Sequence, residues 1–221
     1  MSDYVIIVAG GSGTRMQSQE PKQFLPLAGK AILHHTIEAF HKYDPTFKYI
    51  VALPKEYIEY WKSHSALKKV PGEQILVEGG LERFYTVKNA LEHVKGPGIV
   101  MIHDGVRPLV DSQVIRNTYE VASIRGAAIP VISLNESIRK TDGTSNYALN
   151  RNDYKLVQTP QCFKTEILIN AYKQNFSTEF TDDASVVEKT GQKIFLVDGN
   201  SENIKITSPQ DLLIAEALMK D

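Results

Sequence analysis

The sequence predicts a three-layer α/β protein, in which helices cover both faces of a twisted, mostly parallel sheet and a β-arm projects from it. Short apolar runs rich in Val and Ile alternate along the chain with segments of helical periodicity. Nearly continuous apolar runs are typical of strands buried on both faces of a parallel sheet. Strand–helix alternation favours right-handed crossovers, which place helices on both faces. The length of 221 residues suits a single domain over residues 1–221.

Eight apolar runs predict the strands of this sheet. They cover residues 4–9, 49–53, 74–77, 99–103, 127–132, 155–158, 194–197 and 203–206. In the last run apolar and polar residues alternate, so Ile204 and Ile206 would face the core and Lys205 the opposite side.

Three helices have clear sequence signals. Apolar residues recur at i, i+4 and i+7 from Leu33 to Phe40, the spacing of one helix face. Asp111 is a good N-cap for a helix that follows it. Near the C-terminus Ser208 precedes Pro209, which suits the first turn of a last helix.

Residues 134–153 interrupt this alternation. They are polar, lack a helical apolar stripe and have a Thr-Asp-Gly-Thr turn signal at 141–144. We therefore predict two short strands joined by a turn, with a long surface loop as the alternative. A ribbon of this size is marginally stable alone, so we expect it to pack against a second subunit.

Composition excludes several classes of protein. Lys and Arg number 25 and Asp and Glu 26, a formal net charge of −1, which argues against a general basic surface for nucleic acid. The apolar runs fall far short of the ~20 residues of a membrane helix. The single cysteine, Cys162, excludes an internal disulfide and a cysteine-built zinc site. We expect a cytoplasmic enzyme or small-ligand binder that contacts neither nucleic acid nor membrane.

A glycine-rich loop follows the first predicted strand. It reads Ala9-Gly10-Gly11-Ser12-Gly13-Thr14-Arg15-Met16 and is followed by Lys22. It is not a Walker A loop, and Met16 stands where a dinucleotide fingerprint needs its third glycine. Backbone amides and two cations suit a triphosphate, whereas the alternative is a flexible turn with solvated basic residues.

Asp104 ends a buried apolar run, directly after His103. A carboxylate there would face the ligand crevice and offer Mg²⁺ the hard oxygen ligand that it prefers. The alternatives are an N-cap or an ion pair with Arg107.

Further sequence blocks extend the glycine loop into a family resemblance. A-G-G-x-G-T-R-M followed by P-K-Q-F-L-P-L resembles the 2-C-methyl-D-erythritol 4-phosphate cytidylyltransferase family, which has the sugar-nucleotidyltransferase fold. Five more blocks follow in the family's order, at residues 78–83, 103–108, 158–161, 181–185 and 203–207. The resemblance implies a Rossmann-like nucleotidyltransferase fold and transfer of CMP from CTP to 2-C-methyl-D-erythritol 4-phosphate. The products would be 4-diphosphocytidyl-2-C-methyl-D-erythritol and pyrophosphate, in the non-mevalonate route to isoprenoid precursors, with Mg²⁺ as cofactor.

The resemblance also implies roles for individual residues. The catalytic cations would be Arg15, Lys22 and Lys205. The residues around CTP would be Ala9, Gly10, Gly11, Gly13, Gly80, Arg83 and Thr86. The residues around the acceptor would be Asp104, Arg107, Ser137, Arg151, Thr159 and Thr181. Ser137 and Arg151 would reach the acceptor of a partner subunit in a homodimer joined by the 134–153 arm.

Three alternatives stay open at this point. Ala9-Gly10-Gly11 is shared with the related ribitol 5-phosphate cytidylyltransferases, whereas the block at 181–185 favours the methylerythritol enzymes. A non-catalytic nucleotide-binding module is a further possibility. Capping of a helix would by itself account for Thr181 and the acidic residues after it.

Overall fold

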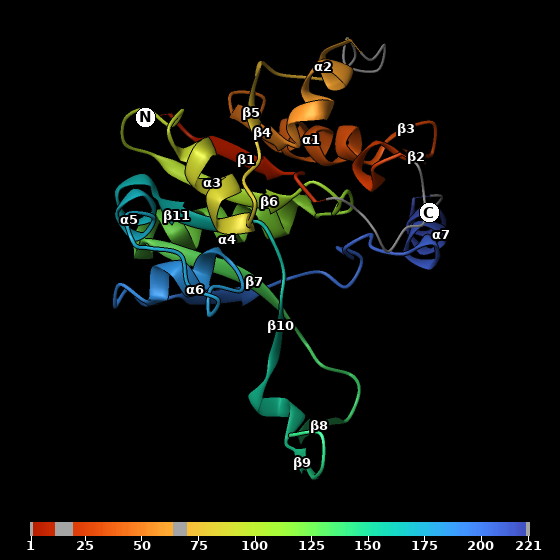
Figure 1. Cartoon of the computed structure of the whole chain (residues 1–221), viewed down its shortest axis with the longest axis vertical. Coiled ribbons are helices and arrows are strands. Elements are labelled where there is room, and N and C mark those ends of the chain that lie inside the picture. The colour runs from red at the N-terminus through yellow and green to blue at the C-terminus, as the bar shows by residue number, and fades with distance from the viewer. Residues whose placement is uncertain (1, 12–19, 64–69, 220–221) are drawn as a thin grey trace.

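The computed structural model describes residues 2–11, 20–63 and 70–219, which are built around one twisted sheet (Figure 1). Half of this sheet is parallel. Its strands lie side by side in the order β5 (Gln74–Glu78), β4 (Lys48–Leu53), β1 (Tyr4–Val8) and β6 (Ile99–Asp104). Because these strands run in one direction, their carboxyl ends meet at one edge of the sheet.

The other half of the sheet is mixed. β11 (Gln161–Lys164) lies antiparallel between β6 and β7 (Ala127–Ser133). β7 also pairs with β10 (Lys155–Val157), which is antiparallel to it, and with β12 (Phe195–Asp198), which is parallel.

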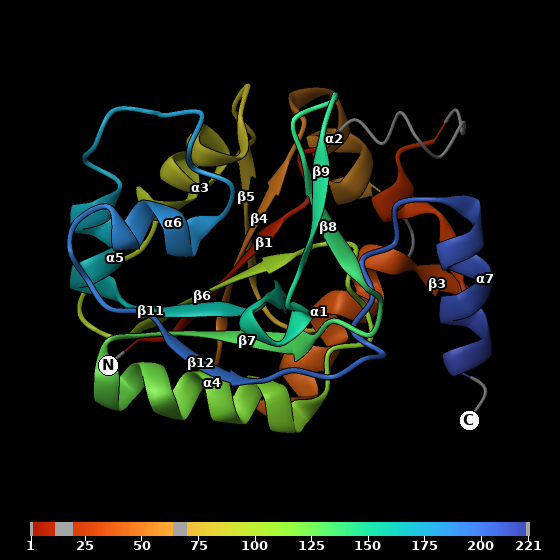
Figure 2. The same cartoon turned by 90° about the horizontal axis from the view of Figure 1, so that it is seen from below.

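Helices cover both faces of the sheet, which confirms the predicted three layers. One apolar core contains residues from α1 (Ile32–Tyr43), α2 (Lys55–Ser63) and α4 (Ser112–Arg125). The core on the opposite face contains residues from α3 (Arg83–Leu91), α5 (Thr165–Ala171) and α6 (Asp183–Glu188). Figure 2 shows α4 and α6 on opposite sides of β7. Along β1 the side chains alternate, since Val5 and Ile7 enter the first core and Tyr4 and Ile6 the second.

Two predicted helix caps are confirmed. The Asp111 carboxylate accepts a hydrogen bond from the Gln113 N–H at the start of α4. Ser208 and Asp211 form a capping box at the start of α7 (Pro209–Leu218), the last helix. Ala215 of α7 packs into a small third core, which also contains Leu27 of β2 (Pro26–Leu27). β2 pairs with β3 (Lys30–Ala31) just before α1.

The predicted arm is a β-hairpin. β8 (Ile138–Thr141) and β9 (Asn146–Leu149) pair antiparallel and project from the body of the molecule (Figure 1). At the turn the Asp142 carboxylate accepts hydrogen bonds from the amides of Thr144 and Ser145. Gly143 has φ 95°, a conformation that favours glycine.

One strand prediction is wrong, because residues 203–206 are not a strand. β11, which lies inside the sheet, was not predicted. Within the described ranges, no helix combines the length and apolar character that crossing a membrane requires.

Candidate active site

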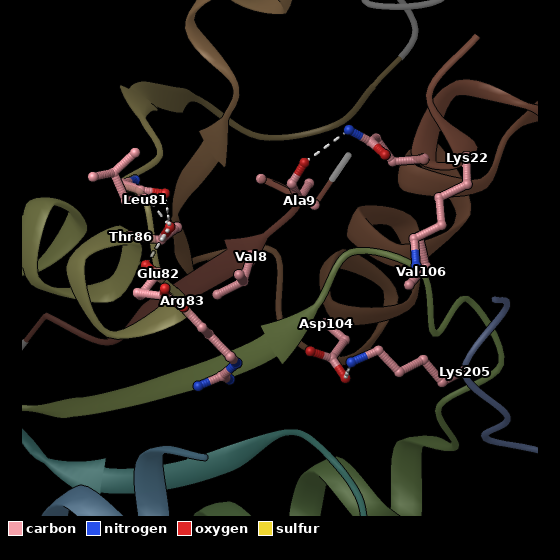
Figure 3. A pocket seen from close by; sticks show the side chains of 14 residues that line it. Val8, Ala9, Lys22, Leu81, Glu82, Arg83, Thr86, Asp104, Val106 and Lys205 are labelled. Carbon is pink, nitrogen blue, oxygen red and sulfur yellow. Dashed lines mark hydrogen bonds and ion pairs between the residues drawn. The ribbon is translucent and has the colours of Figure 1, made fainter. Parts of the chain in front are cut away.

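A cavity of about 210 Å³ lies at the carboxyl ends of β1 and β6 (Figure 3). We call it the first pocket. The loop after β1, the turn between β5 and α3 and the end of β6 converge on it. Its lining residues are Val8, Ala9, Gly10, Gly11, Lys22, Gln23, Gly80, Leu81, Glu82, Arg83, Thr86, Asp104, Val106 and Lys205. This is the edge at which open α/β sheets bind ligands.

A second pocket, of about 280 Å³, adjoins the first. The two pockets share Arg83, Asp104 and Lys205 in their linings. The remaining lining residues of the second pocket are Arg107, Val157, Gln158, Thr159, Gln161, Thr181 and Asp182. The described predicted residues therefore divide between two adjacent pockets, except for the two on the arm.

Asp104 carries two ion pairs in the wall that the pockets share. Its Oδ2 lies 3.1 Å from Arg107 Nε and 3.1 Å from Lys205 Nζ. Burial by itself would raise the pKa of this carboxyl, but Lys205, Arg83 and Arg107 outweigh it and hold the pKa well below its usual range. The ion pair with Arg107, offered as an alternative from the sequence, is present. Among the residues that the structure describes, His, Cys, Asp and Glu nowhere gather in a group of three or more that could hold a metal.

Lys205 reaches Asp104 from an extended segment outside the sheet. Contacts with the turn after β6 fix that segment, since the Ile206 amide donates to the Val106 carbonyl and Arg107 Nη1 donates to the Asn203 carbonyl. Ile206 is fully buried, so Lys205 points away from the core as predicted, although no strand holds it.

A buried carboxylate holds Arg83. Both terminal nitrogens of its guanidinium donate to Asp183, each at 2.6 Å, and the Tyr172 hydroxyl donates to Asp183 Oδ1, also at 2.6 Å. Burial would lower the pKa of Arg83, but Asp183 outweighs it and raises the pKa above its usual value. Asp183, which is fully buried, was not predicted as a site residue. Its place in the 181–185 block was the available signal.

Gln161 connects the second pocket to α6. Its Nε2 donates to Asp182 Oδ2 and its Oε1 accepts from the Ala184 amide. Asp182, not Thr181, is the N-cap of α6, and it forms a capping box with Ser185. The capping role suggested for Thr181 is therefore wrong, and Thr181 instead lines the second pocket.

A glutamine that was not predicted as a site residue holds the residue directly after β1. Lys22 and Gln23 lie in the short 3₁₀ helix η2 (Lys22–Phe24). Gln23 is 1% exposed and its Nε2 donates to the Ala9 carbonyl at 2.8 Å. Gln23 thus joins the segment that carries Lys22 to the end of β1. Two predicted residues of the loop after β1, Gly13 and Arg15, lie outside the described residues.

Gly80 and Thr86 bind each other. The Gly80 amide donates to Thr86 Oγ1 at 3.0 Å, and that hydroxyl lies 3.2 Å from the Glu82 carbonyl, to which it donates. A Cβ on Gly80 would stand 2.3 Å from Tyr85 Cβ, so no side chain fits at this position without movement of α3. The contact between Gly80 and Thr86 fixes the turn that forms one wall of the first pocket.

Thr159 lies beneath Asp104. Its Oγ1 accepts from the Asp104 amide at 3.1 Å and is 3.0 Å from His103 Nδ1. His103 is fully buried, and burial lowers its pKa to about 4. His103 is therefore inaccessible to solvent, and it was not predicted as a site residue.

The arm residues lie apart from both pockets of their own chain. Ser137 and Arg151 are exposed, and neither lines a pocket described above. Arg151, in the 3₁₀ helix η4 (Arg151–Asp153), donates to the Asn135 carbonyl within the arm. Figure 1 shows this arm extending away from the sheet.

Comparison with known proteins identifies the family. The family model for IspD, 2-C-methyl-D-erythritol 4-phosphate cytidylyltransferase, matches residues 4–221. The chain belongs to this family. It is 49% identical over 219 residues to the 2-C-methyl-D-erythritol 4-phosphate cytidylyltransferase of Bacteroides thetaiotaomicron, covering 99% of this chain and 100% of that protein. A relative of the same name from Porphyromonas gingivalis is 41% identical over 217 residues, covering 98% of this chain and 97% of that protein.

Solved structures support the same family. The crystal structure of 2-C-methyl-D-erythritol 4-phosphate cytidylyltransferase from Thermus thermophilus matches with a TM-score of 0.81 and 32% identity, covering all of both chains. The 4-diphosphocytidyl-2C-methyl-D-erythritolsynthase of Anaerococcus prevotii matches with a TM-score of 0.84 and 25% identity, covering 100% of this chain and 96% of that one. The predicted fold and the predicted enzyme family are therefore confirmed.

Proposed function

We propose that this protein transfers CMP from CTP to 2-C-methyl-D-erythritol 4-phosphate, which yields 4-diphosphocytidyl-2-C-methyl-D-erythritol and pyrophosphate. The observation that carries this proposal is the pair of adjoining pockets that share Arg83, Asp104 and Lys205. A transfer between two substrates needs two binding sites that meet at the reacting atoms, and the shared wall is such a meeting point.

The first pocket suits the nucleotide. Its loop after β1 and the turn at Gly80 bring backbone close to a ligand, and Lys22 extends into it from η2 (Figure 3). A lysine at this place can neutralise phosphate oxygens and stabilise the charge that develops on the leaving pyrophosphate. Arg15, which lies outside the described residues, would add a second cation by family resemblance.

The second pocket suits the polyol phosphate. Arg107 and Lys205 supply cations, whereas Asp104 and Thr181 supply oxygens for polyol hydroxyls. An oxygen of the acceptor phosphate would form a bond to the α-phosphorus of CTP. The bond from that phosphorus to the β-bridging oxygen breaks, and pyrophosphate leaves with the electron pair. The second pKa of a phosphate monoester is about 6, so the attacking oxygen is already anionic and needs no general base.

Magnesium would be held chiefly by the triphosphate. Asp104 is the carboxylate in the shared wall, and Mg²⁺ in phosphoryl-transfer sites is typically bound by one or two carboxylates together with substrate phosphates. A single carboxylate fits such a metal, although Lys205 and Arg107 already compete for its Oδ2. Bound there, the metal would neutralise charge on the phosphates.

The arm would complete the site of a second subunit. Arg151 and Ser137 are exposed on the arm, and neither lines the first or the second pocket of its own chain. An arginine fork suits a phosphate monoester, so we assign these residues to the partner's acceptor in a homodimer.

A cytoplasmic location, without nucleic-acid or membrane partners, suits this chemistry. The net charge is −1, and Cys162 is a buried free thiol, as expected in a reducing compartment. Cell fractionation that recovers the protein with membranes or nucleic acid would contradict this assignment.

An acceptor panel tests the proposed function. Pyrophosphate release from CTP and Mg²⁺ is measured with 2-C-methyl-D-erythritol 4-phosphate, ribitol 5-phosphate or a sugar 1-phosphate as acceptor. We expect the highest kcat/KM with methylerythritol phosphate. A higher kcat/KM with ribitol phosphate would make the protein a ribitol 5-phosphate cytidylyltransferase. CTP binding without release of pyrophosphate, whichever acceptor is added, would make it a non-catalytic module.

A further inference from the structure

His103 is a buried polar residue beneath the wall that the two pockets share. It is fully buried on β6, with its ring edge-on to Phe40 at a centroid distance of 4.9 Å. It lines neither pocket, yet both of its ring nitrogens have polar partners that lead to pocket residues. Its surroundings therefore point to a role exerted through its neighbours.

The hydrogen bonds of His103 fix its tautomer. Nε2 lies 3.0 Å from the Arg107 carbonyl, which can only accept, so Nε2 carries the proton. In a neutral ring Nδ1 is then an acceptor, and the Thr159 hydroxyl, 3.0 Å away, donates to it. The same hydroxyl accepts from the Asp104 amide at 3.1 Å. The direction of every bond from Asp104 through Thr159 and His103 to Arg107 is thus determined.

This chain of bonds spans the turn that presents Asp104 and Arg107. The Arg107 amide donates to the Asp104 carbonyl, and Arg107 Nε lies 3.1 Å from Asp104 Oδ2. His103 braces that turn from the protein interior, because Nε2 donates to the Arg107 carbonyl and Nδ1 accepts from the Thr159 hydroxyl. Its ring thereby connects β6, the turn after β6 and the loop before β11.

We propose that His103, as the Nε2–H tautomer, is a positioning residue that sets Asp104 and Arg107 at the acceptor pocket through Thr159 and the Arg107 carbonyl. This inference rests on the proposed function, since it assigns the second pocket to the acceptor. It also limits Thr159, because a hydroxyl whose proton points to His103 cannot donate to a phosphate or carboxylate in the pocket. Thr159 can then contact the acceptor only as a hydrogen-bond acceptor from one of its hydroxyls.

Three substitutions at His103 test the two hydrogen bonds of the ring separately and together. Asparagine has an amide oxygen near the position of Nδ1, so His103→Asn keeps an acceptor for Thr159 and loses the bond to the Arg107 carbonyl. Glutamine can place an amide nitrogen near Nε2, so His103→Gln keeps that bond and loses the acceptor for Thr159. His103→Phe fills the same volume and loses both bonds. His93→Asn, at an exposed histidine that lines neither pocket, is the matched control.

Steady-state kinetics and CTP binding distinguish positioning from a purely structural role. We expect His103→Phe to lower kcat/KM for methylerythritol phosphate about tenfold or more, with a higher acceptor KM. The Kd for CTP alone should stay within about twofold, since the two ring hydrogen bonds of His103 go to Arg107 and Thr159, which do not line the first pocket. His103→Asn and His103→Gln should each lower this kcat/KM less than His103→Phe does. A merely structural role would reduce the folded fraction but leave the acceptor KM of the folded enzyme unchanged.

Nitrogen NMR of the wild-type protein provides a test that requires no variant to be active. In ¹⁵N-histidine-labelled protein, with the His103 signals assigned from their loss in His103→Asn, we expect the Nε2–H tautomer. The Nδ1–H tautomer, or a folded His103→Phe enzyme with wild-type acceptor kinetics, would overturn the proposal. A wild-type protein that transfers no CMP to methylerythritol phosphate contradicts the proposed function instead, while the tautomer still tests the bonding of His103.

Discussion

Asp104 neutralises two of the cations that a phosphate would need. One of its carboxylate oxygens, Oδ2, lies 3.1 Å from both Lys205 Nζ and Arg107 Nε. The two cations are therefore preorganised in the shared wall before any anion binds. A bound phosphate can take over part of this pairing without a large movement of either side chain. Catalysis at this scale then consists of positioning and charge stabilisation, without a general base.

The Lys22 side chain provides the first prediction. Lys22→Ala should lower kcat/KM about 10²-fold, the scale of losing one preorganised donor at a developing charge. Pyrophosphate release under steady-state conditions measures it. Lys173→Ala, which removes an exposed lysine that lines neither pocket, is the control and should retain wild-type turnover. Near-normal turnover in Lys22→Ala would remove Lys22 from the catalytic set.

Two glycines of the first pocket provide a matched pair. A Cβ on Gly10 would meet Thr86 Oγ1 at 3.7 Å, an ordinary contact, whereas a Cβ on Gly80 would stand 2.3 Å from Tyr85 Cβ. We expect Gly10→Ala to keep the CTP affinity within a few-fold and Gly80→Ala to weaken it about tenfold or more, because the turn before α3 must shift. Calorimetric titration with CTP measures both. Equal affinities in the two variants would show that the turn is not rigid.

A buried ion pair at the edge of the second pocket governs stability. Asp183→Asn would leave the Arg83 guanidinium without its bidentate partner, next to a Tyr172 hydroxyl that loses a charged acceptor. We expect the free energy of unfolding to fall by about 3–5 kcal/mol, as when one partner of a buried pair is removed. Urea denaturation measures it. A change below about 1 kcal/mol would mean that water replaces the carboxylate.

Sequence reasoning identified the residues that line the pockets better than those that support them. The described members of the predicted set, apart from Ser137 and Arg151, line one pocket or the other. Gln23, His103 and Asp183 were missed because each is buried and acts through a hydrogen bond to a residue that is distant in the sequence. Such contacts depend on how distant segments pack together, and the local sequence pattern carries no information on that packing.

Among the elements, strand prediction was incorrect where the hydrogen-bond partner of a segment depends on which segments pack beside it. Residues 203–206 alternate like a strand, but they form no ladder with a sheet edge. The Ile206 amide donates to the turn after β6, and the amides of Asn203 and Ile204 donate to carbonyls two or three residues before them. β11 has only two apolar residues, Cys162 and Phe163, and becomes a strand because β6 and β7 flank it. The buried parallel strands were predicted because continuous apolar runs reflect burial on both faces.

The role assigned to the arm can be tested with mixed subunits. If Arg151 serves the partner's site, a mixture of Lys22→Ala and Arg151→Ala subunits should regain activity that neither variant has alone. In a mixed dimer one site would carry both substitutions and the other neither, so an equal mixture should recover about a quarter of the wild-type sites. Turnover is measured after refolding the two variants together.

Light scattering on the wild-type protein accompanies this test. A dimer that shows no recovered activity on mixing would place Arg151 in its own subunit's site. A monomer would leave Arg151 without the role assigned to it.

At the scale of the whole molecule, two apolar cores on opposite faces of the sheet support an edge at which charged groups are buried. Burial would raise the pKa of Asp104, but the neighbouring cations lower it, so the folded protein binds fewer protons there than the unfolded chain. This contribution to stability is present above the usual carboxyl pKa of about 4 and is lost as the pH falls below it. We therefore expect the Tm to fall as the pH is lowered from about 6 toward about 3.5, and to fall less steeply in Asp104→Asn. Parallel curves for the two proteins would contradict this assignment.

Isotope labelling of the acceptor phosphate tests the proposed attack on CTP. ³¹P NMR and mass spectrometry are applied to a reaction of CTP, Mg²⁺ and methylerythritol phosphate labelled with ¹⁸O in its phosphate. Attack by that phosphate on the α-phosphorus of CTP predicts a diphosphate product that retains all of the label, with unlabelled pyrophosphate. Label in pyrophosphate or inorganic phosphate, or CTP consumed without a diphosphate product, would contradict it.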